Sequence, residues 1–135
     1  MNRRILLASL GVLVAAFKEA PKAQSANRDR DPIFRHDLPD LSLHDWSVTA
    51  VEVDYAPGES SKAHTHPGIT FAYVLEGDIT SKLEDEPEKT YASGEMWMET
   101  PGQLHAISRN ASSVKPAKLL AILLAERGKP LTTPA

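Results

Sequence analysis

The feature that most constrains this chain is a succession of short alternating segments separated by turns. In residues 46–55, Val51, Val53 and Tyr55 share one face and polar residues occupy much of the other. Similar short segments follow at residues 69–76, 79–83, 90–91, 96–99, 105–109 and 118–124. Glycine or proline turns separate most of them, and strands recurring roughly every 8 to 12 residues are typical of a sandwich or barrel. The pattern therefore predicts an all-β fold.

Length and composition limit the possible functions. The chain has 135 residues, which favours one folded domain, and it has no cysteine. This excludes disulfides, thiolate zinc sites and cysteine nucleophiles. The formal charge of −3 and the lack of a basic patch argue against a nucleic-acid partner.

The amino terminus has the pattern of an export signal. Arg3 and Arg4 precede the apolar run 5–17, which is shorter than the roughly 20 residues needed to span a bilayer. Small residues around Ala23 and Ser25 suit cleavage near residue 25. We expect a signal peptide at residues 1–25 and an exported protein, periplasmic or secreted, with no membrane attachment after cleavage. The Sec and twin-arginine routes both remain open, as does an uncleaved amphipathic anchor.

The remaining chain divides into three parts. We expect a polar lead-in at residues 26–44, the folded domain at 45–125 and a C-terminal tail at 126–135. Residues 1–25 carry four basic residues and one acidic residue, so their removal changes the formal charge from −3 to −6. This acidic balance favours a small-molecule ligand over a polyanionic one.

Three histidines have the spacing of a metal site. His64 and His66 are two residues apart, which on a strand directs both side chains to one face. Their nitrogens can converge on one ion at about 2.1 Å, and His105 can supply a third ligand from another predicted strand. The alternative is that these histidines merely fill a barrel and bind no metal.

Two motifs around these histidines resemble those of the cupin superfamily. The first runs from Gly58 through His64-Thr65-His66 to Gly77. The second runs from Gly94 through Pro101-Gly102 to His105. The resemblance covers residues 45–125 and implies a double-stranded β-helix, or jelly-roll barrel, with one metal ion inside.

The chain departs from the cupin pattern at three positions. Thr70 stands where the first motif has its glutamate ligand, Thr100 replaces a proline, and Arg109 occupies the asparagine position, with Asn110 following. We therefore predict a site of three histidines, His64, His66 and His105, without a carboxylate. Three neutral imidazoles would leave a divalent ion its full +2 charge and favour an anionic substrate that chelates through two oxygens. Iron(II) is favoured; manganese, nickel, zinc and copper remain open.

These residues suggest a metal-dependent oxidoreductase of the dioxygenase kind, with no catalytic residue beyond the metal ligands. A non-redox isomerase using the metal as a Lewis acid is one alternative. The other is a ligand-binding or sensor module without turnover. Neither the substrate nor the metal follows from the sequence.

Four further residues are candidates for substrate binding: Thr70, Met96, Met98 and Arg109. The methionines could instead fill gaps in the core, and Arg109 could form a surface ion pair. Exposed strand edges would gain from pairing, so we expect a homodimer. The alternative is a monomer in which residues 26–45 cover the edge.

Overall fold

The computed structural model describes residues 31–135, so the predicted signal peptide and the start of the lead-in lie outside the described residues. The described part confirms the all-β prediction, with strands and no helix. Within it, no helix is long and apolar enough to cross a membrane. The strands are β1 (Trp46–Tyr55), β2 (Ser60–Ser61), β3 (His64–Thr65), β4 (Ile69–Glu76), β5 (Asp78–Leu83), β6 (Lys89–Ala92), β7 (Met96–Glu99), β8 (His105–Asn110), β9 (Ala117–Glu126) and β10 (Thr133–Pro134).

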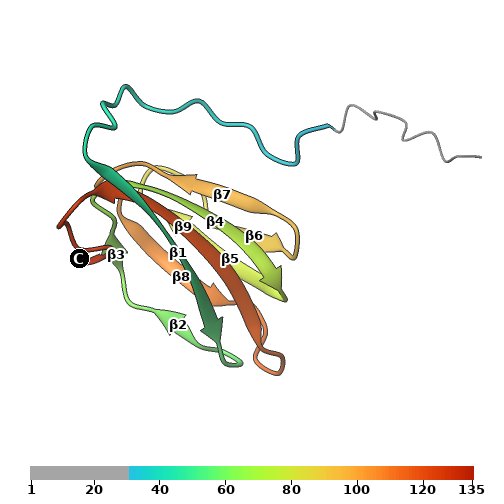
Figure 1. The fold of residues 1–135 in the computed structure, drawn as a ribbon. Helices are drawn as coiled ribbons and strands as arrows, with labels where there is room; N and C mark the ends of the chain where they lie inside the picture. Colours follow the sequence, from blue (N-terminus) through green and yellow to red (C-terminus); the bar gives the residue numbers. More distant parts are fainter. Residues whose placement is uncertain (1–30) are drawn as a thin grey trace, which may run out of the picture. The chain divides into compact units, whose positions relative to one another are not determined.

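The strands form two antiparallel sheets (Figure 1). The first has the order β1-β9-β4-β7, and the second has the order β10-β3-β8-β5-β6, with β2 also paired to β8. Strands far apart in sequence are neighbours in both sheets, as in a double-stranded β-helix. The predicted bounds of β1, β4 and β7 agree with the observed ones.

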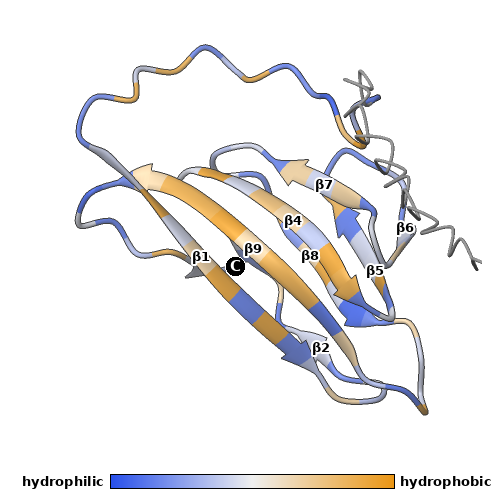
Figure 2. Ribbon diagram, turned by 45° about the vertical axis from the view of Figure 1, so that its right-hand side comes forward, coloured by the Kyte–Doolittle hydropathy of each residue, from blue (hydrophilic) through white to orange (hydrophobic). Residues whose placement is uncertain are grey.

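The hydrophobic core lies between the sheets. Val74 and Ile79 are fully buried, and Trp97 packs against Tyr91 with ring centroids 4.7 Å apart. The hydrophobic residues of β9 form the most continuous apolar strand in Figure 2. Burial of these side chains is the main term that stabilises such a fold.

A β-bulge in β8 changes which of its residues face inward. Lys82 of β5 pairs with Ile107, whereas Leu83 pairs with His105, so Ala106 is an extra residue on β8. The bulge shifts the alternation by one position. Ser108 and Asn110 are therefore buried while Arg109 is exposed.

The bulge also explains the displaced asparagine of the second motif. The Asn110 amide donates hydrogen bonds to the carbonyls of Ala56 and Lys115, and its Oδ1 accepts one from the Ser112 N–H. Asn110 thus fixes the turns at this end of the barrel, one residue later than the motif spacing predicts.

Segments expected to lie outside the domain also contact it. In the lead-in, the ring of Phe34 lies edge-on to that of Phe71, with centroids 6.4 Å apart. In the C-terminal segment, β10 pairs with β3, and Thr133 is opposite Thr65. The C-terminal residues therefore run beside the strand that carries His64.

Candidate metal centre

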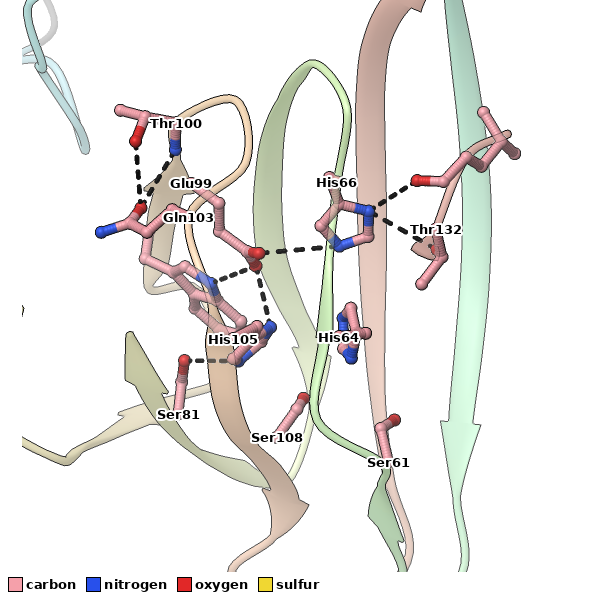
Figure 3. A network of polar contacts seen from close by, with 12 residues as sticks. Ser61, His64, His66, Ser81, Glu99, Thr100, Gln103, His105, Ser108 and Thr132 are labelled. Atoms are coloured by element: carbon pink, nitrogen blue, oxygen red, sulfur yellow. Dashed lines mark hydrogen bonds and ion pairs between the residues drawn. The ribbon is translucent and has the colours of Figure 1, made fainter. Parts of the chain in front are cut away.

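Four side chains from three parts of the barrel converge on one point (Figure 3). They are His64 in β3, His66 just after it, Glu99 at the end of β7 and His105 at the start of β8. One ligand atom from each lies within 4.8 Å of all the others. The pairing of His64 with His105 across β3 and β8 brings the two motifs together.

Each histidine has one nitrogen held by a polar group behind it. Nδ1 of His64 lies 2.7 Å from the Lys62 carbonyl oxygen, and Nδ1 of His66 lies 2.7 Å from the Leu131 carbonyl oxygen. Nε2 of His105 lies 2.8 Å from the Ser81 hydroxyl. A carbonyl behind a ring requires a proton on the nearer nitrogen, which leaves the other nitrogen as a free lone pair. The arrangement is the one expected of metal-binding imidazoles.

Glu99 completes the cluster with a buried carboxylate. Its Oε1 accepts a hydrogen bond from Trp97 Nε1 at 3.0 Å and lies 3.1 Å from His105 Nδ1, and its Oε2 lies 3.6 Å from His66 Nε2. The approaches to the histidines lack hydrogen-bond geometry, so Glu99 Oε2 and His105 Nδ1 are buried without a partner within residues 31–135. Such atoms are costly to bury. A divalent cation would satisfy both, and three imidazoles with one carboxylate form a donor set suited to it.

The electrostatics of the cluster favour the forms that bind metal. Burial raises the pKa of Glu99, but the neighbouring His105 and His66 and the Trp97 hydrogen bond outweigh it, and the pKa lies below its ordinary 4.5. Burial lowers the pKa of His64 below 6.5, and His105 and His66 add to this against the opposing effect of the Lys62 carbonyl. An ionised carboxylate and a neutral imidazole are therefore favoured.

The cluster opens into a cavity of about 500 Å³ between the sheets. This volume lies within the range of small-molecule sites, about 300 to 1,000 Å³. The wall formed by β1 and β9 is apolar, with Val51, Val53, Leu119, Ala121 and Leu123. Leu131, Thr132 and Pro134 from the C-terminal segment also line the cavity.

The structure separates the four predicted substrate-binding residues. Thr70 lines the cavity, whereas Trp97 and Glu99 take the inward positions of β7 and leave Met96 and Met98 on the other face. The methionines line a smaller surface depression beside Ile33 and Phe34. This corrects their assignment as substrate-binding residues.

Arg109 also lies away from the cavity. Its side chain is 44% exposed and forms a 2.9 Å ion pair with Glu88, the surface alternative considered above. The β-bulge accounts for the difference, because strict alternation from His105 would have directed Arg109 inward.

Glu99 was missed by the sequence reasoning, and its presence corrects the expectation of a site without a carboxylate. Thr70 and Glu99 are direct partners across β4 and β7, so their side chains share a face. The carboxylate that the motif places on β4 is thus supplied by the adjacent strand. A divalent ion here would keep a net charge of +1 rather than +2. The sequence did contain one signal for Glu99: it is the only acidic residue in the otherwise apolar strand β7, and alternation places it on the same face as Trp97.

Comparison with known proteins identifies the class. The family model described as Cupin domain matches residues 51–123, more than half of the chain, so the chain belongs to the cupin family. Two germin-like proteins of Arabidopsis thaliana, subfamily 2 members 2 and 4, are 34% and 31% identical over 83 residues, or 58% of this chain. The chain spans 37% of the length of each.

Solved structures share the fold at low sequence identity. DMSP lyase DddQ from Ruegeria pomeroyi DSS-3 has a TM-score of 0.59 and 19% identity, covering 66% of this chain and 43% of its own. A cupin-like protein from Thermotoga maritima has a TM-score of 0.57 and 17% identity, with coverages of 65% and 64%. Oxalate decarboxylase from B. subtilis has a TM-score of 0.55 and 19% identity, with coverages of 65% and 24%. These similarities support the double-stranded β-helix fold alone.

Proposed function

We propose that this cupin is a metal-dependent oxidoreductase, dioxygenase-like, acting on a small anionic organic substrate that chelates through oxygen. The observation that carries the proposal is the cluster of His64, His66, Glu99 and His105 in the lining of a cavity, with two buried atoms that lack a partner within residues 31–135. The net positive charge of a loaded site supports an anionic substrate, although less strongly than the carboxylate-free site would have.

The residues of the chain would hold the metal ion and orient the substrate, and none of them would transfer a proton. The cluster would fix the ion and leave room on the cavity side for substrate, while the apolar wall excludes water. A bound divalent ion would supply Lewis acidity and, where it is redox-active as iron(II) is, electrons for dioxygen chemistry. Three nitrogens and one carboxylate suit iron(II), and the carboxylate makes manganese more acceptable than three imidazoles alone would.

The test is oxygen consumption by iron(II)-loaded protein with β-diketone and catechol-like compounds. We expect uptake to require substrate and metal and to vanish in a His64→Ala His105→Ala double variant. A His36→Ala His44→Ala variant is the matched control, because both histidines are exposed and lie outside the cluster. Loss of uptake in the control as well would contradict assignment of the chemistry to this cluster.

The non-catalytic binding module makes a different prediction. If the protein is such a module, its ligand affinity should be unchanged after metal removal, and no metal should give turnover. The buried, partnerless atoms argue for the metal-dependent alternative, because a module without metal would keep their desolvation cost. Ligand affinity measured before and after metal removal separates the two. Elemental analysis of protein purified without added metal tests the further alternative, in which the histidines merely fill the barrel and bind no metal.

We also infer an exported homodimer, on separate grounds. Export depends on the pattern of residues 1–25. The dimer is supported by β1, an edge strand whose Val48 is 67% exposed. Light scattering that gives a monomer mass would exclude the dimer.

A further inference from the structure

We infer that the cavity selects a small monoanion with an apolar body, and that the Thr70 hydroxyl is the chain's own polar contact to it. The inference depends on the proposed metal site and goes beyond it by naming the substrate class and a residue that determines specificity. It follows from three features of the cavity: its apolar wall, its few charges and an unpartnered hydroxyl.

The first feature is the composition of the wall. Val51 and Val53 of β1 and Leu119, Ala121 and Leu123 of β9 belong to the sheet that faces β3 and β8, where His64 and His105 lie. A ligand held by the cluster would place the remainder of its body against these side chains. An apolar body gains free energy there by leaving water, whereas a polar one would lose its hydration without replacement.

The second feature is the charge inside the cavity. Outside the cluster, Lys62 is the one charged side chain among the described residues that line it, and Lys62 is exposed to solvent. Arg109 of β8 forms its ion pair with Glu88 at the surface and does not line the cavity. A divalent ion with Glu99 has a net charge of +1, which one carboxylate neutralises. A dianion would place a second charge against an apolar wall, and burial of an unpaired charge is strongly unfavourable.

The third feature is Thr70. Its side chain is 1% exposed and lines the cavity, and its Oγ1 has no hydrogen-bond partner within residues 31–135. Thr70 lies directly opposite Glu99, so the two side chains lie side by side on the inner face of the sheet. A carboxylate oxygen of a ligand would accept the hydrogen bond that the protein leaves unmade, which gives this hydroxyl a role in binding rather than in packing.

Isothermal titration calorimetry on the zinc-loaded full chain tests the inference without turnover. The probes are straight-chain alkanoates from acetate to octanoate, with succinate as the dianion. We expect affinity to rise about three- to fourfold for each added methylene until the cavity is filled. Succinate should bind more weakly than butyrate, which has the same number of carbon atoms.

Two variants assign the contact to Thr70. Thr70→Val keeps the shape and removes the hydroxyl, and we expect it to weaken alkanoate binding about tenfold with zinc content unchanged. Thr70→Ser keeps the hydroxyl and should retain most of the affinity. Ala121→Leu should shorten the series, because a larger side chain on the apolar wall leaves less room for the longer alkanoates.

The outcomes separate this inference from the proposed function. Zinc retention with equal or tighter binding of succinate than of butyrate, or with affinity independent of chain length, overturns the substrate class and leaves the metal site standing. Equal affinity in Thr70→Val and the parent protein overturns the role of Thr70. Failure to retain any metal overturns the proposed function and this inference with it.

Discussion

Glu99 is the residue on which the charge of the site depends. It is 2% exposed and is the one acidic side chain of the described cluster. We predict that Glu99→Gln lowers divalent-metal affinity by about tenfold to a hundredfold or more, because a neutral amide is a weak ligand in place of a carboxylate. Competition with a chromogenic chelator measures the change.

The matched control for this variant is Glu88→Gln. Glu88 is a half-exposed carboxylate that pairs with Arg109 at the surface, and exposed pairs of this kind contribute little to stability. Its substitution should leave metal affinity unchanged. Equal affinities in Glu99→Gln and Glu88→Gln would show that the site is held by histidines alone, as the sequence had predicted.

Ser81 would not bind the metal itself, but it contacts the ligand His105. Its hydroxyl lies 2.8 Å from His105 Nε2 and fixes the ring that directs Nδ1 toward Glu99. We predict that Ser81→Ala weakens metal binding about tenfold to a hundredfold, the usual effect of losing a group behind a ligand. Ser93→Ala is the control, because the Ser93 hydroxyl is exposed and bonds the Leu75 carbonyl away from the cluster. Unchanged affinity in Ser81→Ala would assign the orientation of His105 to packing alone.

At the scale of elements, strands with clear alternation were predictable and the two-residue strands were not. β1, β4 and β7 have clear alternation and turn residues at their ends, so local pattern fixed their bounds. β2 and β10 have two residues each, and β10 exists through its pairing with β3 almost seventy residues away in sequence. No local pattern specifies such a partner.

The difference between local pattern and long-range pairing also explains which site residues were predicted from the sequence. The histidines were found because the His64-Thr65-His66 motif is local. Glu99 was missed because its role depends on register across β4 and β7, which places it opposite Thr70. The outward position of Arg109 depends on a bulge for which the sequence has no signal.

This register leads to a prediction about strand exchange. Since Thr70 and Glu99 are directly opposed and share a face, the carboxylate could be supplied from either strand. We predict that Glu99→Thr loses most metal affinity and that the double variant Thr70→Glu Glu99→Thr recovers a large part of it. Recovery will be incomplete, because Trp97 Nε1 then lacks the carboxylate oxygen it contacts at 3.0 Å. The measurement is zinc affinity by competition.

The control for the exchange places the carboxylate on the outward face of β4. Tyr73→Glu with Glu99→Thr has the same formal charge as the double variant, but Tyr73 does not line the cavity. It should bind metal no better than Glu99→Thr alone. Equal recovery in both double variants would mean that net charge, rather than position in the register, restores binding.

At the scale of the whole molecule, the site and the fold are linked through protons. Without metal, the barrel must bury three imidazoles and a carboxylate at one end of its cavity. Burial is the largest cause that holds the pKa of His64 below 6.5, so the folded state resists protonation of His64 more than the unfolded chain does. Where the unfolded state binds more protons than the folded state, the free energy of unfolding rises with pH.

The metal-free protein should therefore lose stability in acid. The stability that His64 contributes is fully present above 6.5 and is lost as the pH falls below that value, because the unfolded chain is protonated first. We predict that urea unfolding of the metal-free protein shows this loss and that His64→Gln, which cannot be protonated, reduces it. His44→Gln is the control, because His44 is exposed and outside the cluster. A pH dependence in His64→Gln as steep as that of the parent would place the acid sensitivity elsewhere in the barrel.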